Sequence, residues 1–488
     1  MLEFKRADID VEQFREYFDK SKIQFCDMSV GAKYMWRNDF VIDYAYFKDT
    51  LILRESCPDY KNAFYFPLTK EGNAKADEGG QDYITKAESD ALSEIEKYCK
   101  KEGEPLLFCC IDERTKNLLK NRYKDIEFSF NRDWSDYIYN ASDFITYAGK
   151  KFSGQRNHVH KFTNTYPNFE FKQLLGRDIP RIVEFFSEYE RETTVSMWSE
   201  REEEKYVIDY AEKSFALGQL GGYIEVDGKM VALSIGEVVG DTLIVHVEKG
   251  LKEYAGVYPT MAQLFARNYA VDGVKYINRE EDCGDMGLRT SKTQYHPIEI
   301  KSKYMARVKT AFDKILPPVS ISSERLTTSD ISESDKDTYA KLYLDNELNK
   351  YYGYDYREDL GENTPNSDYF YSFMQGLKAK HEEYSLAVRE GKELIGEIVL
   401  YEFDFFGGAE IGFRFFENFQ HKGYALESVS AVLDYAKNML GVSVMHARAY
   451  KKNAPSIKLL ERLGFSLVSG SDKPDGKNTE MNFYKKEL

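Results

Sequence analysis

The stretch EIGFRFFENFQHKGYALESVSAVLDYAKNML, residues 410–440, decides the fold of the C-terminal part of the chain. Its opening segment is rich in Phe, which favours strands. From Tyr424 onward, apolar residues recur at helical spacing, at positions 425, 429, 432, 433, 436 and 440. Gln420, His421 and Lys422 stand before Gly423, where the helix is expected to begin. Because helix N-termini present unpaired N–H groups and a partial positive charge, these residues predict a site for an anion such as phosphate.

The segments on either side complete one α/β unit. A hairpin of two strands is predicted by EYSLAVREGKELIGEIVLYEF (383–403), and a further strand by VSVMHARAY (442–450). The segment NAPSIKLLERLGF (453–465) begins with an Asn cap and closes with Gly, so it predicts a short helix. The expected order is strand, strand, strand, helix, strand, helix, strand, strand.

Pro317 and Pro318 precede a run rich in Ser, Thr and Asp, which predicts a linker and a domain boundary near residue 318. The order of elements found after this boundary recurs twice upstream, where the middle copy ends in one strand, IEIKSKYMARV (298–308). We therefore expect an α/β (α+β) fold of three mixed-sheet units, at residues 1–148, 149–315 and 319–488. The alternative is a coincidence of element order.

The composition restricts the class of protein. The chain has 488 residues, a net charge of -15 and a pI of about 5.2, which argues against DNA as a partner. No apolar run approaches the ~20 residues of a transmembrane segment, and the N-terminus lacks the apolar core of a signal peptide. A cytoplasmic location is expected. The six cysteines lack metal-type spacing, so we expect reduced structural thiols and no metal.

Three segments together resemble the GNAT superfamily of N-acetyltransferases, and most closely its branch that acetylates ribosomal-protein N-termini. They are EIGFRF, QHKGYA (420–425) and the pattern N-x-x-S-x-x-x-L-x-x-x-G-F at 453–465. The resemblance implies acetyl-CoA as cofactor and an amine-bearing small molecule or peptide as acceptor. The cofactor-binding residues that it implies are Phe415, Phe416, Gln420, His421, Lys422, Gly423, Tyr424, Ala425 and Asn453. His421 departs from the family, which usually has Gly there.

Acetyl transfer requires a neutral amine, and the leaving thiolate requires a proton. Glu410 is the candidate base, acting directly or through water; an exposed strand-end Glu is the alternative interpretation. The family's usual acid is a Tyr at the position of Leu460, so Ser456 is the nearest replacement. A role in helix capping and packing is the alternative for Ser456.

The middle unit keeps a glycine, Gly256, but has Glu253, Tyr254 and Ala255 where the C-terminal unit has its cations. Because Glu repels phosphate, we expect this unit not to bind CoA in the usual way. Polar residues gather elsewhere, at expected strand ends and around a short helix, and form a candidate substrate site: Lys150, Lys151, Arg156, Glu248, Lys249, Glu280, Asp282, Arg289, Lys292 and Tyr295. We expect the cations of 150–156 to converge with Arg289 and Lys292; a solvated salt-bridge face is the alternative.

The N-terminal two thirds resembles the C-terminal domain of bacterial phosphatidylglycerol lysyltransferases. The resemblance lies in DWSDYIYNASDFITYAGKKFSGQRNHVHKF (133–162), HVEKGLKEYAGVYP (246–259) and NREEDCGDMGLRTSKTQYHP (278–297). That domain is a tandem of GNAT-like units, so the resemblance implies three GNAT-like units, two in tandem at the N-terminus and one at the C-terminus. It also implies aminoacyl-tRNA as a partner. The leading hypothesis is a fused acyltransferase: an acetyl-CoA-dependent N-acetyltransferase joined to an aminoacyltransferase-like module with an unknown acceptor. The rival is a noncatalytic N-terminal module that binds substrate or tRNA.

Overall fold

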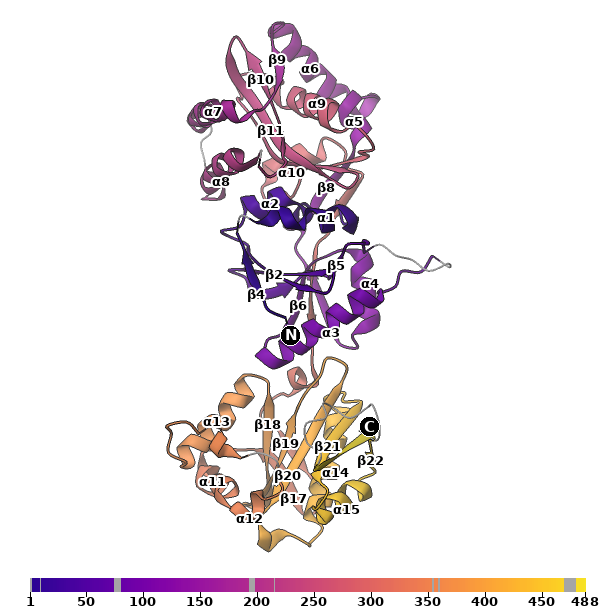
Figure 1. Cartoon of the computed structure of the whole chain (residues 1–488), viewed down its shortest axis with the longest axis vertical. Helices are drawn as coiled ribbons and strands as arrows, with labels where there is room; N and C mark the ends of the chain where they lie inside the picture. Colours follow the sequence, from indigo (N-terminus) through magenta and orange to yellow (C-terminus); the bar gives the residue numbers. More distant parts are fainter. Residues whose placement is uncertain are drawn as a thin grey trace. The chain divides into compact units, whose positions relative to one another are not determined.

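The structure is a computed structural model that describes residues 2–8, 10–73, 80–192, 198–214, 216–352, 355–358, 360–468 and 480–488. The chain forms two compact units (Figure 1). The first is Met1–Tyr98, Leu106–Leu119 and Phe128–Arg307, and the second is Cys99–Pro105, Lys120–Glu127 and Val308–Leu488. They contain three β-sheets, and helices connect the strands of each sheet, which confirms the predicted mixed α/β class. Among the described residues, no helix combines the length and apolar character needed to cross a membrane.

The first sheet has the order β1-β2-β3-β4-β6-β15-β7, with β5 beside β3. Its strands are β1 (Lys5–Ala7), β2 (Val41–Phe47), β3 (Thr50–Cys57), β4 (Tyr60–Phe64), β5 (Leu68–Thr69), β6 (Leu106–Ile111), β7 (Ile126–Phe130) and β15 (Tyr304–Val308). The helices of this part are α1 (Arg15–Ser21), α2 (Val30–Met35), α3 (Lys86–Glu102) and α4 (Glu113–Arg122).

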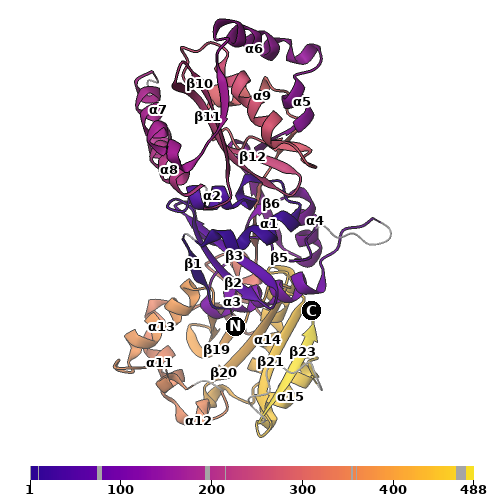
Figure 2. The ribbon, with the colours of Figure 1, turned by 45° about the horizontal axis from the view of Figure 1, so that its top comes forward.

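The second sheet has the order β14-β8-β13-β12-β11-β10-β9. Its strands are β8 (Asp136–Asn140), β9 (Glu170–Gln173), β10 (Leu220–Val226), β11 (Lys229–Val239), β12 (Thr242–Gly250), β13 (Tyr276–Asn278) and β14 (Glu299–Lys301). Its helices are α5 (Ala141–Thr146), α6 (Ser153–Thr165), α7 (Ile179–Glu192), α8 (Trp198–Ser214), α9 (Val257–Tyr269) and α10 (Met286–Thr293). Helices α5, α6 and α9 cover one face of this sheet, whereas α7 and α8 cover the other (Figure 2).

The single strand expected at residues 298–308 is wrong, because the structure has two strands that belong to different sheets. β14 pairs with β8 in the second sheet, and β15 lies between β6 and β7 in the first. Ala306 and Val308 are buried and alternate with exposed Arg307, the pattern of a strand with one covered face. This pattern does not specify which sheet the strand joins. Strand β8 also joins the second sheet although it precedes residue 149, so the sheets do not divide at residues 148 and 149.

The third sheet has the order β16-β17-β18-β19-β20-β21-β23-β22. Its strands are β16 (Ser320–Ser322), β17 (Leu326–Asp330), β18 (Glu383–Glu390), β19 (Glu393–Tyr401), β20 (Gly408–Phe415), β21 (Val444–Tyr450), β22 (Ser466–Leu467) and β23 (Met481–Glu487). Helices α14 (Tyr424–Asn438) and α15 (Ala454–Arg462) appear where the sequence predicts them. Helices α11 (Lys336–Leu344), α12 (Asn346–Asn349) and α13 (Ser367–Ala379) complete the domain.

The run after Pro318 is not simply a linker, because β16 and β17 lie within it. Strand β17 pairs with β18 over its whole length. Leu326 and Thr328 are buried and the residues between and after them are half-buried, so polar Ser and Thr side chains are tolerated on the less covered face. The polar composition therefore misled the interpretation of this segment.

Candidate functional sites

In the third sheet, β20 and β21 are parallel neighbours that separate after a short paired stretch. Their register runs from Gly408 opposite Val444 to Glu410 opposite His446. Beyond Glu410, residues 411–415 remain paired with β19 on their other side, but have no described partner on the β21 side. A backbone edge that is open on one side can pair with an extended ligand.

Glu410 lies at the last paired position of this divergence. Its carboxylate accepts a hydrogen bond from Tyr401 at 2.6 Å and lies 3.0 Å from the Arg448 guanidinium. Only 4% of the residue is exposed, so the alternative of an exposed strand-end Glu is wrong. Burial raises the pKa of Glu410 even though Arg448 opposes the rise. A carboxylate with a raised pKa is a better proton acceptor than an ordinary one.

The loop after β20 leads directly into α14. The Gln420 amide donates to the carbonyl of Phe415 at 2.9 Å, which closes the loop on the end of the strand. His421 has a φ of 62°, in the left-handed region that favours glycine, at the position where the resembling family has Gly. Gly423 has a φ of 79° and begins the helix, and His421 and Lys422 are exposed beside it. The loop thus combines exposed cations with a helix N-terminus.

Arg325 is a cation at this loop that the sequence analysis missed. Its guanidinium donates to the carbonyl of Lys422 at 3.2 Å, forms an ion pair with Glu427 at 2.7 Å and lies over the Tyr424 ring. It belongs to the run interpreted as a linker, and nothing local in that run signals its position. Arg325 holds the loop from the carbonyl side of the Lys422–Gly423 peptide.

The remaining predicted residues of the C-terminal site lie around this loop or on the next helix. Phe415 is buried in the core with Tyr424, whereas Phe416 and Ala425 are partly buried. The Asn453 side chain caps α15 by accepting a hydrogen bond from the Ser456 amide at 3.3 Å. The backbone of Ser456 thus takes part in the helix cap, which is the alternative role considered for this residue. Its catalytic role stays a prediction.

In the second sheet, the start of α9 is covered by the chain itself. Gly256 has a φ of 90°, as Gly423 does at the start of α14. A Cβ atom placed on Gly256 would lie 2.2 Å from the carbonyl oxygen of His158, which belongs to α6. Glu253 forms an ion pair with Lys229. These contacts agree with the expectation that this unit lacks a phosphate loop.

The predicted acidic and basic residues of this part form pairs with different partners, one of which, Arg279, was not predicted. Arg279 donates to Glu248 at 2.6 Å, and Glu280 hydrogen-bonds His246 at 2.7 Å. Asp282 accepts from Arg289 at 2.8 Å, and from Arg132 and the Tyr137 hydroxyl. The structure therefore brings Asp282 and Arg289 together as an ion pair, and Asp133 accepts from Arg289 as well, which is the arrangement of the salt-bridge alternative; a ligand-binding role of Arg289 stays a prediction.

The other predicted cations do not converge with Arg289. Lys151 pairs with Asp143 at 2.9 Å, Arg156 donates to the Gly149 carbonyl at 2.6 Å, and Lys150 is exposed. Lys292 donates to the backbone carbonyl of Glu281, Lys249 lies near the Tyr189 ring, and Tyr295 is buried and stacks on Phe144. These contacts therefore do not form the single cationic pocket that was expected from residues 150–156, Arg289 and Lys292.

Comparisons with known proteins agree with both resemblances. The model of the family described as phosphatidylglycerol lysyltransferase, C-terminal, matches residues 18–307, which is more than half of the chain. The chain belongs to this lysyltransferase family. The model of the GNAT acetyltransferase domain matches residues 325–466. The C-terminal domain therefore makes the chain an acyltransferase, as predicted.

Relatives of each part are also known. The uncharacterised N-acetyltransferase p20 of Bacillus licheniformis is 29% identical over 166 residues, which cover 33% of this chain and 92% of that protein. The uncharacterised N-acetyltransferase YoaA of Bacillus subtilis is 27% identical, over 30% of this chain and 81% of that protein. A crystal structure of a conserved protein of unknown function from Bacteroides thetaiotaomicron is 28% identical, with a TM-score of 0.57, and covers 63% of this chain and all of that one.

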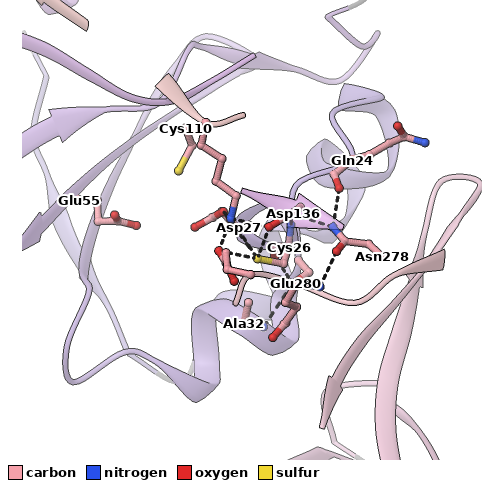
Figure 3. Close-up of polar contacts among 12 residues, drawn as sticks. Gln24, Cys26, Asp27, Ala32, Glu55, Cys110, Asp136, Asn278 and Glu280 are labelled. Carbon is pink, nitrogen blue, oxygen red and sulfur yellow. Dashed lines mark hydrogen bonds and ion pairs between the residues drawn. The ribbon is translucent and has the colours of Figure 1, made fainter. Parts of the chain in front are cut away.

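The lysyltransferase-family part contains a buried charge network that the sequence analysis missed. The Lys303 ammonium contacts Asp27 at 2.5 Å, Asp136 at 2.8 Å and Glu281. Cys26, Asp27 and Asp136 gather in one place, with Asn278 beside them (Figure 3). Burial raises the pKa of Asp136 to about 7 although Lys303 opposes the rise. Cys26, Asp27 and Glu281 are close enough to hold a metal ion, but Lys303 already supplies a positive charge to all three.

His246 extends this network toward α2. Its ring hydrogen-bonds Glu280 on one side and Glu237 on the other, and Glu237 accepts from the Gly31 amide at 2.5 Å. Burial alone would lower the pKa of His246, but these two carboxylates outweigh it and raise the pKa to about 9. Members of the network lie far apart in the sequence, from Arg15 to Lys303, so no local motif reveals it.

Proposed function

We propose that the C-terminal domain transfers the acetyl group of acetyl-CoA to the amine of a small molecule or peptide. The observation that carries this proposal is the separation of β20 from β21 at buried Glu410, followed by the exposed cationic loop at the start of α14. The proposed base Glu410, the open strand edge and the loop thus follow one another along one segment. The GNAT match and the relatives named N-acetyltransferases support the same reaction.

The residues of the domain have distinct roles in this proposal. The backbone of 411–416 binds the extended arm of the donor, and the amides from His421 to Ala425 bind its phosphates. Glu410 takes the proton of the acceptor amine, directly or through a water molecule, while Tyr401 and Arg448 hold its carboxylate in place. Ser456 is the candidate that returns a proton to the leaving thiolate.

The acetyl transfer is tested by incubating the full chain with acetyl-CoA and a panel of primary amines and peptides, with release of free thiol as the signal. We expect the release of free thiol from acetyl-CoA to be faster with at least one acceptor than without any acceptor. Glu410→Gln should lower kcat, and Gly423→Asp should raise KM for acetyl-CoA. A wild-type chain that binds acetyl-CoA but acetylates no amine would refute the proposed reaction.

For the lysyltransferase-family part, we propose aminoacyl transfer from aminoacyl-tRNA to an acceptor that is not yet identified. The family match and the concentration of buried, mutually hydrogen-bonded charged groups support it, since perturbed ionisable groups cluster at functional sites. The alternative is a noncatalytic module that binds substrate or tRNA. Full chain incubated with radiolabelled aminoacyl-tRNA and a panel of amine and hydroxyl acceptors separates them: label that moves from the tRNA to an acceptor supports transfer, and tRNA binding without such movement supports the module.

A further inference from the structure

One arginine contacts the loop of residues 420–425 on both sides of Gly423. Arg325 lies in the connection between β16 and β17, 97 positions before Lys422 in the chain. Its guanidinium donates to the carbonyl of Lys422 at 3.2 Å, and both Nε and Nη2 lie 2.7 Å from the carboxylate of Glu427. Lys422 precedes Gly423, and Glu427 lies in the first turn of α14. A single side chain therefore ties the loop to the helix that follows it.

The contact with Lys422 fixes the direction of the next backbone amide. The Lys422–Gly423 peptide is trans, and in a trans peptide the carbonyl and the following N–H are held in one plane and point in opposite directions. Because Arg325 holds the Lys422 carbonyl, it also sets where the N–H of Gly423 points. That N–H has no hydrogen-bond partner among the described residues. The arrangement therefore presents an unpaired donor in a fixed direction at the start of α14, where an anion can accept from it.

The second contact of Arg325 removes a charge that would oppose a phosphate. The side chain of Glu427 is 15% exposed and accepts hydrogen bonds at 2.7 Å from the backbone amide of Arg325 and from the hydroxyl of Ser323. Burial alone would raise the pKa of Glu427, but these hydrogen bonds and the guanidinium outweigh it and lower the pKa. The carboxylate is therefore ionised close to the loop, and without its cation it would repel the phosphates of a donor.

Contacts within the same domain hold Arg325 in one orientation. Its guanidinium lies 4.7 Å from the centre of the Tyr424 ring, and the hydroxyl of Tyr424 donates to Glu390 at the end of β18. The side chain of Arg325 is nevertheless 44% exposed, so burial in the core does not account for these contacts. Fixing a side chain in advance lowers the entropy cost of binding a ligand, which favours a role of Arg325 in ligand binding.

We propose that Arg325 is a positioning residue for the phosphates of the acyl donor. It directs the N–H of Gly423 toward them through the Lys422 carbonyl, and it cancels the negative charge of Glu427 beside them. This role rests on the acetyl transfer proposed above, which requires the donor. Arg325 therefore matters for a donor that carries a pyrophosphate and not for one that lacks it.

Calorimetry on the full chain tests this role with two donors, acetyl-CoA and S-acetylpantetheine, which has the same thioester and arm but no phosphate. Arg325→Met keeps an unbranched side chain and removes all of its hydrogen-bond donors. We expect the affinity for acetyl-CoA to fall at least tenfold and the affinity for S-acetylpantetheine to stay the same. Arg357→Met is the matched control, because Arg357 is an exposed Arg of the same domain that pairs with Asp355 outside the loop, and it should leave both affinities unchanged.

Two results with Arg325→Met would overturn the proposal. One is an unchanged affinity for acetyl-CoA in a folded variant. The other is an equal loss of affinity for both donors, which would mean that Arg325 only supports the structure of the domain. A wild-type chain that does not bind acetyl-CoA would instead refute the proposed donor, so the two failures are distinguishable.

A second variant separates the two effects of Arg325 and remains a valid test if Arg325→Met does not fold. Glu427→Gln removes the repelling charge and leaves Arg325 on the Lys422 carbonyl, so acetyl-CoA should bind at least as tightly as to the wild type. When both substitutions are combined, the affinity should recover only in part, because the Gly423 amide is no longer directed. Weaker binding in Glu427→Gln, or no recovery in the double variant, would contradict the charge effect, and full recovery would contradict the positioning of the amide.

Discussion

Replacement of Gly423 by Asp tests the phosphate loop most directly, because the structure separates its two effects. Gly423 has a φ of 79°, so any L-residue there is strained, at a cost of about 1–3 kcal/mol. Among the described residues, a Cβ at this position would meet only Arg325, at 3.5 Å, so steric clash is small. The new carboxylate stands where the phosphates of the donor should bind. Two like charges ~4 Å apart repel by ~1 kcal/mol in water and ~4 kcal/mol near a protein surface.

The expected result is a dissociation constant for acetyl-CoA that is at least tenfold higher, or about 1.4 kcal/mol, measured by calorimetry on the full chain. Gly391→Asp is the matched control. Gly391 has a φ of 60° in the turn between β18 and β19, and no described residue lies within 4 Å of its Cβ position, so a substitution there shares the strain but lies away from the proposed phosphate site. Equal affinity in Gly423→Asp and Gly391→Asp would show that the loop is not the phosphate site.

Three further predictions concern single residues. Glu410→Gln should lower kcat with little change in KM. It should also remove the low-pH limb of the rate profile, because burial raises the pKa of Glu410 and only the ionised carboxylate accepts a proton. A low-pH limb that is unchanged in this variant would show that another residue is the base. The pKa of His246 is raised to about 9 from an ordinary 6.5, so its charge stabilises the fold fully below pH 6.5 and this stabilisation is lost as pH rises to 9. Denaturant unfolding should show that the unfolding free energy of the wild type falls over this pH range relative to that of His246→Asn. The same pH dependence in both proteins would contradict the prediction. Gly31→Ala should lower the unfolding free energy by about 1–3 kcal/mol, because its Cβ would lie 2.6 Å from His246 and 2.7 Å from the Tyr210 hydroxyl, and an unchanged denaturant midpoint would refute this close packing.

The C-terminal site is predictable from sequence because its parts are local. Glu410, the loop at 420–425 and the apolar spacing of α14 occupy one continuous stretch, so strand, loop and helix follow from neighbouring residues. The fold class was predictable for the same reason. Arg325 was not, since it reaches the loop from the connection between β16 and β17, whose Ser and Thr residues resemble those of a linker.

The N-terminal site was less predictable because its contacts are long-range. Asp282 and Arg289 are only seven positions apart and form an ion pair, but Lys303 meets Asp27 across most of the unit. That contact depends on β15 entering the first sheet, which residue periodicity does not specify. Arg279 was not predicted, because its partner Glu248 lies on the other of the two diverging strands and is distant in the sequence.

The two glycines at the starts of α9 and α14 show why a motif must be interpreted with its surroundings. Both have a positive φ and both begin a helix. Gly423 is next to exposed Lys422, and among the described residues a Cβ there would meet only the end of a flexible Arg325 side chain, so glycine leaves room for the anion that we propose to bind here. Gly256 is pressed against the His158 carbonyl, and Glu253 nearby is already paired with Lys229, so glycine there permits close packing of α6 on α9. The same residue at the start of the equivalent helix thus makes a helix contact in one unit and is left open beside cations, as the proposed phosphate loop requires, in the other; the charge of the preceding residues is the sequence signal that distinguishes them.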